Sequence, residues 1–413
     1  MIFIRGLILS PRCISPKNKV QQIGDNFIIA MSLSLIPRVR VNFSFFDLLK
    51  SIFVSEENYK ARRECESILA SFFDRECVLL VPSARDAIYE LLIRLPHKKV
   101  VIPAYTCIAV VEAATLAKKE LVFCETDSTT YNAKYLDYIT QDSIILATHQ
   151  YGIPCNIEAI AEKCVKTGAV LIEDCATSMG TTVNGKITGT FGDYAMVSFN
   201  VSKLINVPPV AGVLVGKNRD LLDRIRQEAD WKPSDLKFKC KSIIRGLAFV
   251  ATKNPVVYKL FHYVTIASKG KLQKTEHKKP SEKKTPLYLY RFAEWQAVIL
   301  LRQLRQLDMF FGKRRELYDY YDKHISNPLV KKPICDSNAV CCRYAIQVNN
   351  RDEFYKKCVE KGVDMDFSHC TLGCPDTFSA EHRISKFILN LPYYFNLSDK
   401  ERDKVVNVVN SIS

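Results

Sequence analysis

The chain is predicted to fold as an α/β protein in which helices cover both faces of a mostly parallel sheet. Short apolar segments alternate with amphipathic helical segments from about residue 78 to residue 174, the pattern of repeated strand-helix-strand units. Five polar residues directly follow predicted strands, and these are Ser83, Cys107, His149, Asp174 and Lys203. Because ligands bind beyond the carboxyl ends of parallel strands, these side chains are expected to converge on one crevice.

The elements of the large domain are predicted in order along the chain. Residues 78–95 predict a strand, a turn at Pro82 and Ser83, and a helix with Ile88 and Leu92 on its apolar face. Further strands are predicted within 99–106, 120–127, 142–149 and 169–174, with helices over 110–117 and 157–167. An Asn-Gly pair at 184–185 predicts a hairpin turn, because both residues tolerate a positive φ.

The C-terminal part is predicted to form a helical region and a small α+β domain. The helical region begins at Glu294 and continues toward Tyr321. A strand is expected over 343–348, a helix over 351–361 and a last helix from Ser398. The expected division is an N-terminal extension (1–45), a large cofactor-binding domain (46–230), a basic apolar insert (231–285) and a helix with the small domain (286–413).

Composition places the chain among large globular proteins of a reducing compartment. Its 413 residues, 47% of them apolar, can bury a large core. Fifteen cysteines without a convincing secretory signal indicate free thiols and a cytoplasmic location. The pair Cys341 and Cys342 and the pair Cys370 and Cys374 beside His369 are candidate metal ligands, but no second Cys-x-x-Cys unit completes a tetrahedral site. No metal is therefore expected.

The first 45 residues are basic and contain one apolar run. This run, residues 27–37, has 11 residues and is too short to span a bilayer, so no transmembrane helix is expected. Two interpretations of the start remain. Either Met31 is the true first residue, or residues 1–30 form a disordered arm.

Lys203 and Asp174 indicate a reaction class. Asp174 closes an apolar strand, and Lys203 follows it by 29 positions. An enzyme that uses pyridoxal phosphate needs such a pair, since the amine forms a Schiff base with the cofactor's aldehyde and the carboxylate keeps the pyridine nitrogen protonated. The alternatives are a helix-capping role for Asp174 and a solvated surface position for Lys203.

Seven motifs extend this interpretation over the chain from about Pro82 onward. They are V-I-P-A-Y-T (101–106), T-H-Q-Y-G (148–152), I-E-D-C-A (172–176), G-T-F-G-D-Y (189–194), S-F-N-V-S-K (198–203), W-Q-A-V-I-L-L-R-Q-L (295–304) and I-L-N-L-P (388–392). In this order they resemble the DegT/DnrJ/EryC1/StrS family of sugar aminotransferases, which are pyridoxal phosphate enzymes. The resemblance implies the aspartate aminotransferase fold (fold type I), with a mostly parallel seven-stranded sheet, a smaller C-terminal domain and a homodimer.

The resemblance also implies residue roles. Lys203 would be the lysine that binds the cofactor, Asp174 its pyridine partner and Ser198 a phosphate ligand. The backbone N–H groups of Ser83 and Ala84, where a helix begins, would face the same phosphate. Arg291 would reach across the dimer interface.

Some positions depart from the family's pattern. Cys107 stands where an aromatic residue usually stacks on the ring, and Thr177 stands where a glutamine usually lies near the cofactor's hydroxyl. Pro82 and Leu289 replace residues that usually contact the phosphate. Two further residues are expected near the cofactor or the substrate. Tyr105 is a substitute for the stacking residue if its loop is rearranged, and His149 is either a core histidine or a neighbour of the cofactor.

The insert carries most of the net charge. Residues 232–284 contain 14 Lys and Arg against three acids, so 14 − 3 gives +11 of the chain's formal +15. Two apolar stretches within it, 242–253 and 256–264, predict either helices that lie on an anionic membrane or helices of the core or dimer interface. Nucleic acid is not an expected ligand, because no recognition fold accompanies the charge.

The sequence therefore predicts a pyridoxal-phosphate-dependent aminotransferase. Its expected substrates are a nucleotide-linked keto sugar and an amino-acid donor, glutamate, in the biosynthesis of a surface glycan or polysaccharide. The alternative is a non-catalytic or altered-reaction homologue that acts at a membrane surface as a partner of glycan-assembly enzymes. The expected location is the cytoplasm, with peripheral membrane binding through residues 232–284.

Overall fold

The computed structural model describes residues 33–269, 289–335, 338–367 and 372–413. The expectations about the chain start at Met31, about a disordered arm over residues 1–30 and about the candidate ligands His369 and Cys370 concern residues outside these ranges. The lysine-rich part of the insert, residues 270–288, also lies outside them.

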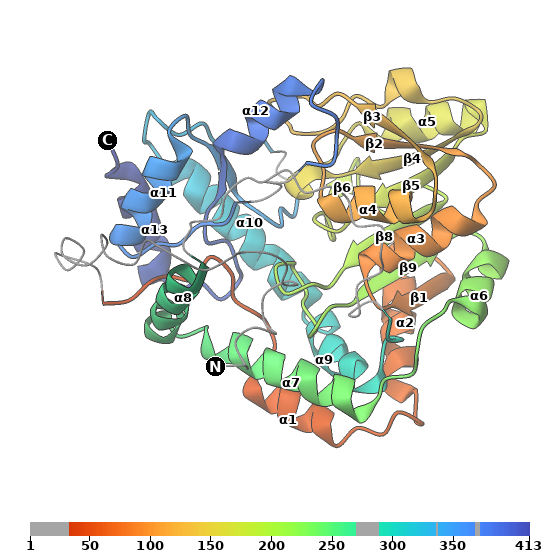
Figure 1. Ribbon diagram of the computed structural model, residues 1–413, viewed down its shortest axis with the longest axis horizontal. Helices are drawn as coiled ribbons and strands as arrows, with labels where there is room; N and C mark the ends of the chain where they lie inside the picture. Colours follow the sequence, from red (N-terminus) through yellow and green to blue (C-terminus); the bar gives the residue numbers. More distant parts are fainter. Residues whose placement is uncertain (1–32, 270–288, 336–337, 368–371) are drawn as a thin grey trace, which may run out of the picture.

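A seven-stranded sheet forms the centre of the large domain (Figure 1). Its order is β1-β9-β8-β5-β4-β2-β3, and its strands are β1 (Cys77–Val81), β2 (Lys99–Pro103), β3 (Glu120–Cys124), β4 (Ser143–Thr148), β5 (Val170–Asp174), β8 (Tyr194–Ser198) and β9 (Gly212–Gly216). The neighbours from β8 to β3 are parallel, whereas β9 is antiparallel to both β1 and β8. The predicted α/β fold with a mostly parallel sheet is confirmed.

Helices bury both faces of this sheet. Consecutive strand residues point to opposite faces, so Leu79 packs with one set of helices and Leu80 with the other. The face of Leu79 is covered by α3 (Ala84–Arg94), α4 (Ile108–Leu116) and α6 (Arg219–Glu228). The opposite face is covered by α2 (Lys60–Phe73), α5 (Ile157–Thr167) and α9 (Glu294–Leu304). Burial of both faces explains why the strands are almost continuously apolar.

Local sequence signals act as expected at several element ends. Ser83 caps α3 by accepting a hydrogen bond from the backbone N–H of Asp86 at 3.1 Å. Asn184 and Gly185, with φ of 50° and 79°, join β6 (Thr182–Val183) to β7 (Lys186–Ile187) in the predicted hairpin. Ser398 caps α13 (Asp399–Asn410).

The helical region predicted from Glu294 toward Tyr321 is present, and it consists of two helices. Helix α9 ends at Leu304, and α10 (Leu307–His324) begins after Gln306, whose φ of −123° and ψ of 18° are not helical. Leu304 and Leu307 lie on either side of this break, and both enter the same core cluster, at 3% and 8% exposure.

The C-terminal elements lie together beside the sheet domain, coloured blue in Figure 1. Strands β10 (Ala345–Gln347) and β11 (Ile388–Asn390) pair antiparallel, and α11 (Arg351–Glu360), α12 (Ser379–Phe387) and α13 accompany them. One core cluster joins these elements to residues of α10, including Leu317 and Tyr321. The predicted strand, the helix at 351–361 and the last helix are all present.

Residues 35–43, expected to belong to an N-terminal extension, are packed into the protein. The backbone N–H of Leu35 donates to Pro255 O at 3.1 Å, and Ile36 pairs with Gly362 and Asp364 at 2.9 and 3.1 Å. Leu35 and Ile36 are each 2% exposed. The end of the apolar run 27–37 therefore contributes to the core, because its side chains would otherwise leave apolar surface in water.

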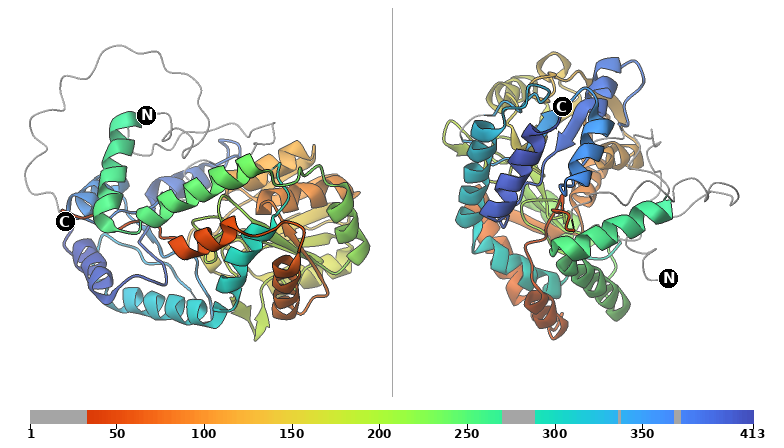
Figure 2. Two further views of the ribbon diagram at one scale, coloured as in Figure 1. Left: turned by 90° about the horizontal axis from the view of Figure 1, so that it is seen from below. Right: turned by 90° about the vertical axis from the view of Figure 1, so that its left-hand side faces the viewer.

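Two helices form the described part of the insert. Helix α7 (Leu236–Ala251) lies along α1 (Phe45–Ile52), and a Cβ added at Gly246 would meet Leu48 at 2.9 Å, so glycine permits this close approach (Figure 1). Helix α8 (Pro255–Lys269) follows and lies at the periphery of the molecule (Figure 2). Within the described residues, no helix combines the length and the apolar character needed to cross a membrane.

Helix α8 contacts the small domain through the buried hydroxyl of Tyr258 and through His262, whose Nε2 lies 3.4 Å from the Tyr355 hydroxyl. The Tyr258 hydroxyl donates to Asp364 Oδ2 at 2.5 Å, and Asp364 Oδ1 also accepts from Tyr355 at 2.8 Å. Asp364 is 0% exposed and Tyr258 is 7% exposed. Since hydrogen bonds to a charged group are stronger than neutral ones, this contact is expected to stabilise the docking of α8.

We expect Tyr258→Phe to lower the free energy of unfolding by about 1.5–3 kcal/mol, because a buried carboxylate loses a donor. Urea unfolding followed by circular dichroism measures the change. Tyr263→Phe is the matched control, since Tyr263 lies on the same helix at 68% exposure. Equal unfolding midpoints for the two variants would contradict the role given to the Tyr258 hydroxyl.

Candidate active site

A pocket of about 120 Å³ lies where the carboxyl ends of β4, β5 and β8 meet the N-terminus of α3. Residues from six separate segments line it, as expected for a site at the edge of a parallel sheet. Seven residues predicted from the sequence are among them, and these are Ser83, Ala84, Cys107, Asp174, Thr177, Ser198 and Lys203.

Asp174 ends β5 and is 5% exposed. Its Oδ1 accepts a hydrogen bond from the backbone N–H of Ala176 at 2.9 Å. Burial raises the pKa of the Asp174 carboxyl, and the Ala176 N–H and the nearby positive charge of Lys203 oppose this shift. A buried carboxylate of this kind is stabilised by a cationic partner in the pocket.

Lys203 follows β8 in a loop whose backbone is held on both sides. Its N–H donates to Asn200 O at 2.9 Å, and its carbonyl oxygen accepts from Asn206 Nδ2 at 3.3 Å. The half-buried side chain lines the pocket of Asp174 and also a second, smaller cavity on the side of the C-terminal elements. Lys203 is therefore placed between two cavities.

The N-terminus of α3 forms the opposite end of the pocket. Ser83 Oγ donates to Asp86 Oδ2 at 2.7 Å, and Arg85 forms an ion pair with Glu112 at 2.8 Å. A Cβ at Gly212 would lie 2.7 Å from Ala84 N, so only glycine allows β9 to approach this turn. Gly212 pairs with Ser198 in the ladder, which brings Ser198 close to the helix N-terminus.

Three buried polar atoms at this pocket have no hydrogen-bond partner among the described residues. They are Thr106 Oγ1, Thr148 Oγ1 and Gln150 Nε2. The sequence interpretation did not single out these residues, because threonine and glutamine after a strand are common and carry no specific signal. Buried polar groups are normally satisfied, so their arrangement indicates a polar ligand.

Of the four positions that depart from the family's pattern, Cys107 and Thr177 line the pocket, whereas Pro82 and Leu289 are not among its lining residues. Cys107 precedes α4 and is exposed. The Thr177 hydroxyl donates to His149 O at 2.7 Å and is thus engaged with the backbone.

Three other predicted residues do not line the pocket. Tyr105 is 0% exposed, and its hydroxyl lies 2.6 Å from that of Tyr151 in a separate core cluster, so its ring is not available to a ligand in the pocket. His149 is also 0% exposed and lies beneath the pocket. Arg291 is exposed, and its backbone N–H donates a hydrogen bond to Lys232 O at 2.8 Å.

His149 belongs to a buried cluster with Glu173 and Cys175 whose ligand-type atoms lie within 4.8 Å of one another. The carboxylate of Glu173 accepts from the backbone N–H groups of Gly189, Phe191 and Gly192 at 2.7–2.8 Å and contacts His149 Nε2 at 3.2 Å. These contacts occupy the carboxylate and explain the cluster as the support of the loop before β8. The 13 cysteines in the described ranges are all free thiols.

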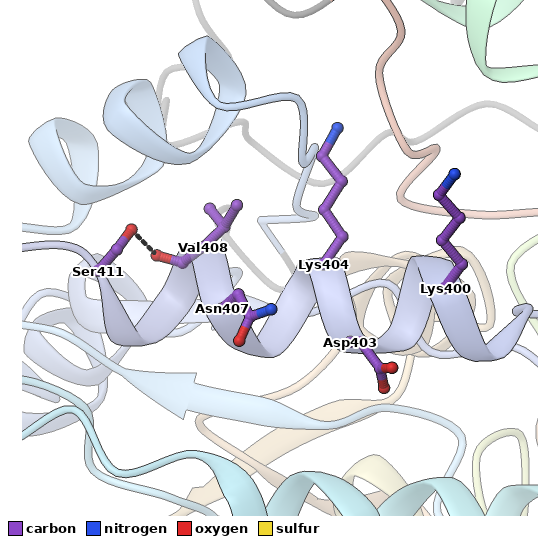
Figure 3. A pocket seen from close by; sticks show the side chains of 6 residues that line it. All are labelled: Lys400, Asp403, Lys404, Asn407, Val408 and Ser411. Carbon is purple, nitrogen blue, oxygen red and sulfur yellow. Dashed lines mark hydrogen bonds between the residues drawn. The ribbon is translucent and has the colours of Figure 1, made fainter.

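A larger hollow of about 630 Å³ lies on the outer face of α13 (Figure 3). Its lining residues all come from this one helix and are Lys400, Asp403, Lys404, Asn407, Val408 and Ser411. The only hydrogen bond that Figure 3 shows between them joins the Ser411 hydroxyl to Val408 O at 2.9 Å. Because no other element in the described part of the chain contributes a side chain, this hollow lacks the convergence seen at the Asp174 pocket.

Comparison with known proteins places the whole of this architecture in one family. The profile of the DegT/DnrJ/EryC1/StrS aminotransferase family matches residues 45–410. The chain is 25% identical over 327 residues to the dTDP-3-amino-3,6-dideoxy-alpha-D-galactopyranose transaminase of Aneurinibacillus thermoaerophilus, covering 76% of this chain and 78% of that protein. It is 29% identical over 233 residues to the GDP-perosamine synthase of Escherichia coli O157:H7, a match that covers 55% of this chain and about half (52%) of that relative.

Solved structures agree at the level of the fold. A DegT DnrJ EryC1 StrS aminotransferase from Brucella abortus superposes with a TM-score of 0.67 at 19% identity, covering 88% of this chain and 94% of that one. The PMP form of a putative sugar aminotransferase from Streptococcus pneumoniae gives a TM-score of 0.69 at 16% identity, covering 91% and 98%. The chain therefore belongs to the DegT/DnrJ/EryC1/StrS aminotransferase family, and the predicted enzyme class, a pyridoxal-phosphate-dependent sugar aminotransferase, is confirmed as that of the family.

Proposed function

We propose that this protein transfers an amino group from glutamate to a nucleotide-linked keto sugar, with pyridoxal phosphate as cofactor, in the biosynthesis of a glycan or polysaccharide. The observation that carries the proposal is the single pocket that contains Asp174, Lys203 and the N-terminus of α3. The names of the relatives, a transaminase and a synthase of nucleotide-linked amino sugars, support the substrate class. A non-catalytic homologue is not favoured, because both Lys203 and Asp174 are retained at the pocket.

The residues present fit the cofactor. Asp174, buried and close to positive charge, suits a protonated pyridine nitrogen. The backbone N–H groups at the start of α3 suit a phosphate, since a helix N-terminus attracts anions. The unsatisfied Gln150 Nε2 is a donor that could take the place of the glutamine that Thr177 replaces, because it lines the same pocket.

Pyridoxal phosphate supplies an aldehyde that combines with amines and a ring that withdraws electrons. Lys203 would hold the cofactor before the amino donor arrives and would then carry a proton away from the donor's Cα. In the second half of the reaction the same amine would return a proton to the sugar carbon that receives nitrogen. The carboxylate of Asp174 would stay ionised throughout and keep the ring nitrogen protonated.

We expect Lys203→Ala to abolish turnover and the visible absorbance that borohydride removes, because Lys203 is the only lysine among the described residues that line the pocket. Absorbance spectroscopy of the purified protein with added cofactor measures this directly. Lys166→Ala is a control, since Lys166 is 70% exposed and pairs with Glu162 on α5. Unchanged absorbance and activity in Lys203→Ala would contradict the assignment.

We also propose that the protein is a homodimer in which Arg291 serves the partner's pocket. Within one subunit Arg291 is exposed and does not line the pocket that contains Lys203. A symmetric dimer would place each Arg291 at the other subunit's site in the same way.

Mixed dimers test this arrangement. We expect Lys203→Ala and Arg291→Ala, each inactive at limiting cofactor, to regain about a quarter of the wild-type activity after co-refolding, because random pairing leaves one intact site in each heterodimer. Mixing Lys203→Ala with Asp174→Ala is the control, since both residues belong to one subunit's pocket and no intact site can form. Absence of recovery in the first mixture would contradict the crossing arginine.

A second candidate role, binding to an anionic membrane surface, is favoured by the exposed face of α8. Its apolar residues recur at helical spacing on this face and are Val256, Val257, Leu260, Tyr263 and Val264, with exposures of 37–68%. Helix α1 exposes a face with the same spacing at Phe45, Phe46, Leu49, Ile52 and Phe53. Apolar faces of this kind beside a basic segment are typical of helices that lie in a lipid interface.

We expect the protein to sediment with anionic vesicles but not with neutral ones, and the binding to weaken as salt rises. Leu260→Ser and Tyr263→Ser should release it without altering the absorbance of the bound cofactor. Val165→Ser is the control, because Val165 is 84% exposed on α5. Equal sedimentation with both vesicle types, or none, would leave these faces to a dimer interface.

A further inference from the structure

The second cavity beside Lys203 is small and strongly basic. It has room for about 10 Å³ of water-sized solvent, which is roughly one water molecule. Five cations line it, and these are Arg38, Arg40, Lys203, Arg314 and Arg343. No carboxylate lies among its described lining residues.

Three of the five cations lie near carboxylates that are not among the described lining residues of the cavity. Arg40 forms an ion pair with Glu401, and Arg343 with Asp366. Arg38 lies 3.8 Å from Asp364. Arg314 differs from these three, since no carboxylate among the described residues lies within 4 Å of its guanidinium.

Arg314 has hydrogen bonds but no compensating charge. Its Nη1 donates to Cys342 O at 3.0 Å and to Tyr393 O, and its guanidinium lies 4.8 Å from the centre of the Tyr393 ring. Its Nε is buried and has no hydrogen-bond partner among the described residues, and Arg314 as a whole is 4% exposed. Burial lowers the pKa of Arg314 from its ordinary value.

A purely structural role does not account for these features. Two backbone carbonyls can be held by a neutral donor, whereas an unpaired buried charge is strongly destabilising. A positive charge kept in such a place is stabilised when an anion enters, and Arg is suited to a carboxylate through its fork of donors.

We propose that Arg314 binds the α-carboxylate of the amino donor in the cavity that it shares with Lys203. The inference rests on the proposed aminotransferase function, because it concerns the donor's binding at that site. Lys203 acts at the donor's Cα, and the α-carboxylate is bonded to that same carbon. The cavity, with room for about one water molecule, is far too small for the diphosphate of a nucleotide sugar, and a carboxylate is the smaller of the two anionic groups.

The wild-type protein with bound cofactor tests the proposal without any substitution. L-glutamate and its α-amide, L-isoglutamine, share the amine and the side-chain carboxylate but differ in the α-carboxylate. Their dissociation constants are measured by spectral titration in the absence of sugar and, independently of turnover, by calorimetry with the α-methyl analogues, which cannot lose a Cα proton. We expect the α-amide to bind on the order of 10- to 100-fold more weakly.

Variants then assign the effect to Arg314. Arg314→Gln should weaken the binding of L-glutamate by a similar factor and leave the binding of L-isoglutamine unchanged. Arg314→Lys should give an intermediate affinity for L-glutamate. Arg305→Gln is the control, because Arg305 is an exposed arginine paired with Glu64. If Arg314→Gln does not fold, the comparison of the two wild-type ligands still decides whether a carboxylate site exists, and Arg314→Lys assigns it.

Two failures are distinguishable. Equal affinity of wild type for L-glutamate and L-isoglutamine, or equal loss of both ligands in Arg314→Gln, would overturn the carboxylate site while leaving the aminotransferase intact. If the bound cofactor shows its borohydride-sensitive absorbance but no amino acid changes it, the proposed function fails as well as the site.

Discussion

The candidate site depends on the buried carboxylate of Glu173. It is 0% exposed and accepts three backbone N–H groups from the loop that precedes β8, in addition to its contact with His149. Because neighbouring strand residues point to opposite faces, the same strand end that anchors this loop through Glu173 presents Asp174 to the pocket. Hydrogen bonds to an ionised acceptor are stronger than neutral ones and offset the cost of its burial. The loop, β8 and Lys203 after it are thereby placed relative to Asp174.

The parts of the fold that could be predicted from the sequence are those in which secondary structure is determined by residues close together in the chain. The Asn-Gly hairpin, the Ser83 cap and the alternating strands and helices up to Asp174 are local in this sense. The bounds of β8 and the presence of β9 were not predicted, since Y-A-M-V-S and G-V-L-V-G are short apolar runs that periodicity cannot assign. The position of β9 between β1 and β8 arises from pairing over more than 100 residues for β1.

At the site, too, the residues recognisable from local sequence were predicted, and those whose role depends on their three-dimensional surroundings were missed. Lys203 and Asp174 could be singled out because their chemistry is rare in combination, and the structure brings them to one pocket. Gln150 was missed, because its significance lies in a buried donor without a partner, which is visible only once its surroundings are known. Tyr105 was considered as a stacking residue, but its hydroxyl meets that of Tyr151, 46 positions away, in a core that faces away from the pocket.

The insert and the N-terminal segment are connected to the site through Asp364. This carboxylate accepts from Tyr258 of α8 and lies 3.8 Å from Arg38, which lines the cavity shared by Lys203 and Arg314. The segment that carries Arg38 is itself held between α8 and the small domain by the backbone hydrogen bonds of residues 35 and 36. A displacement of α8 would therefore remove a donor from Asp364 and change how strongly that carboxylate holds Arg38. Since the cavity is only about one water molecule in size, a small movement of one lining arginine would alter its shape and its charge. Any partner that binds α8, a membrane or a second protein, would act on a helix that shares a buried carboxylate with the wall of this cavity.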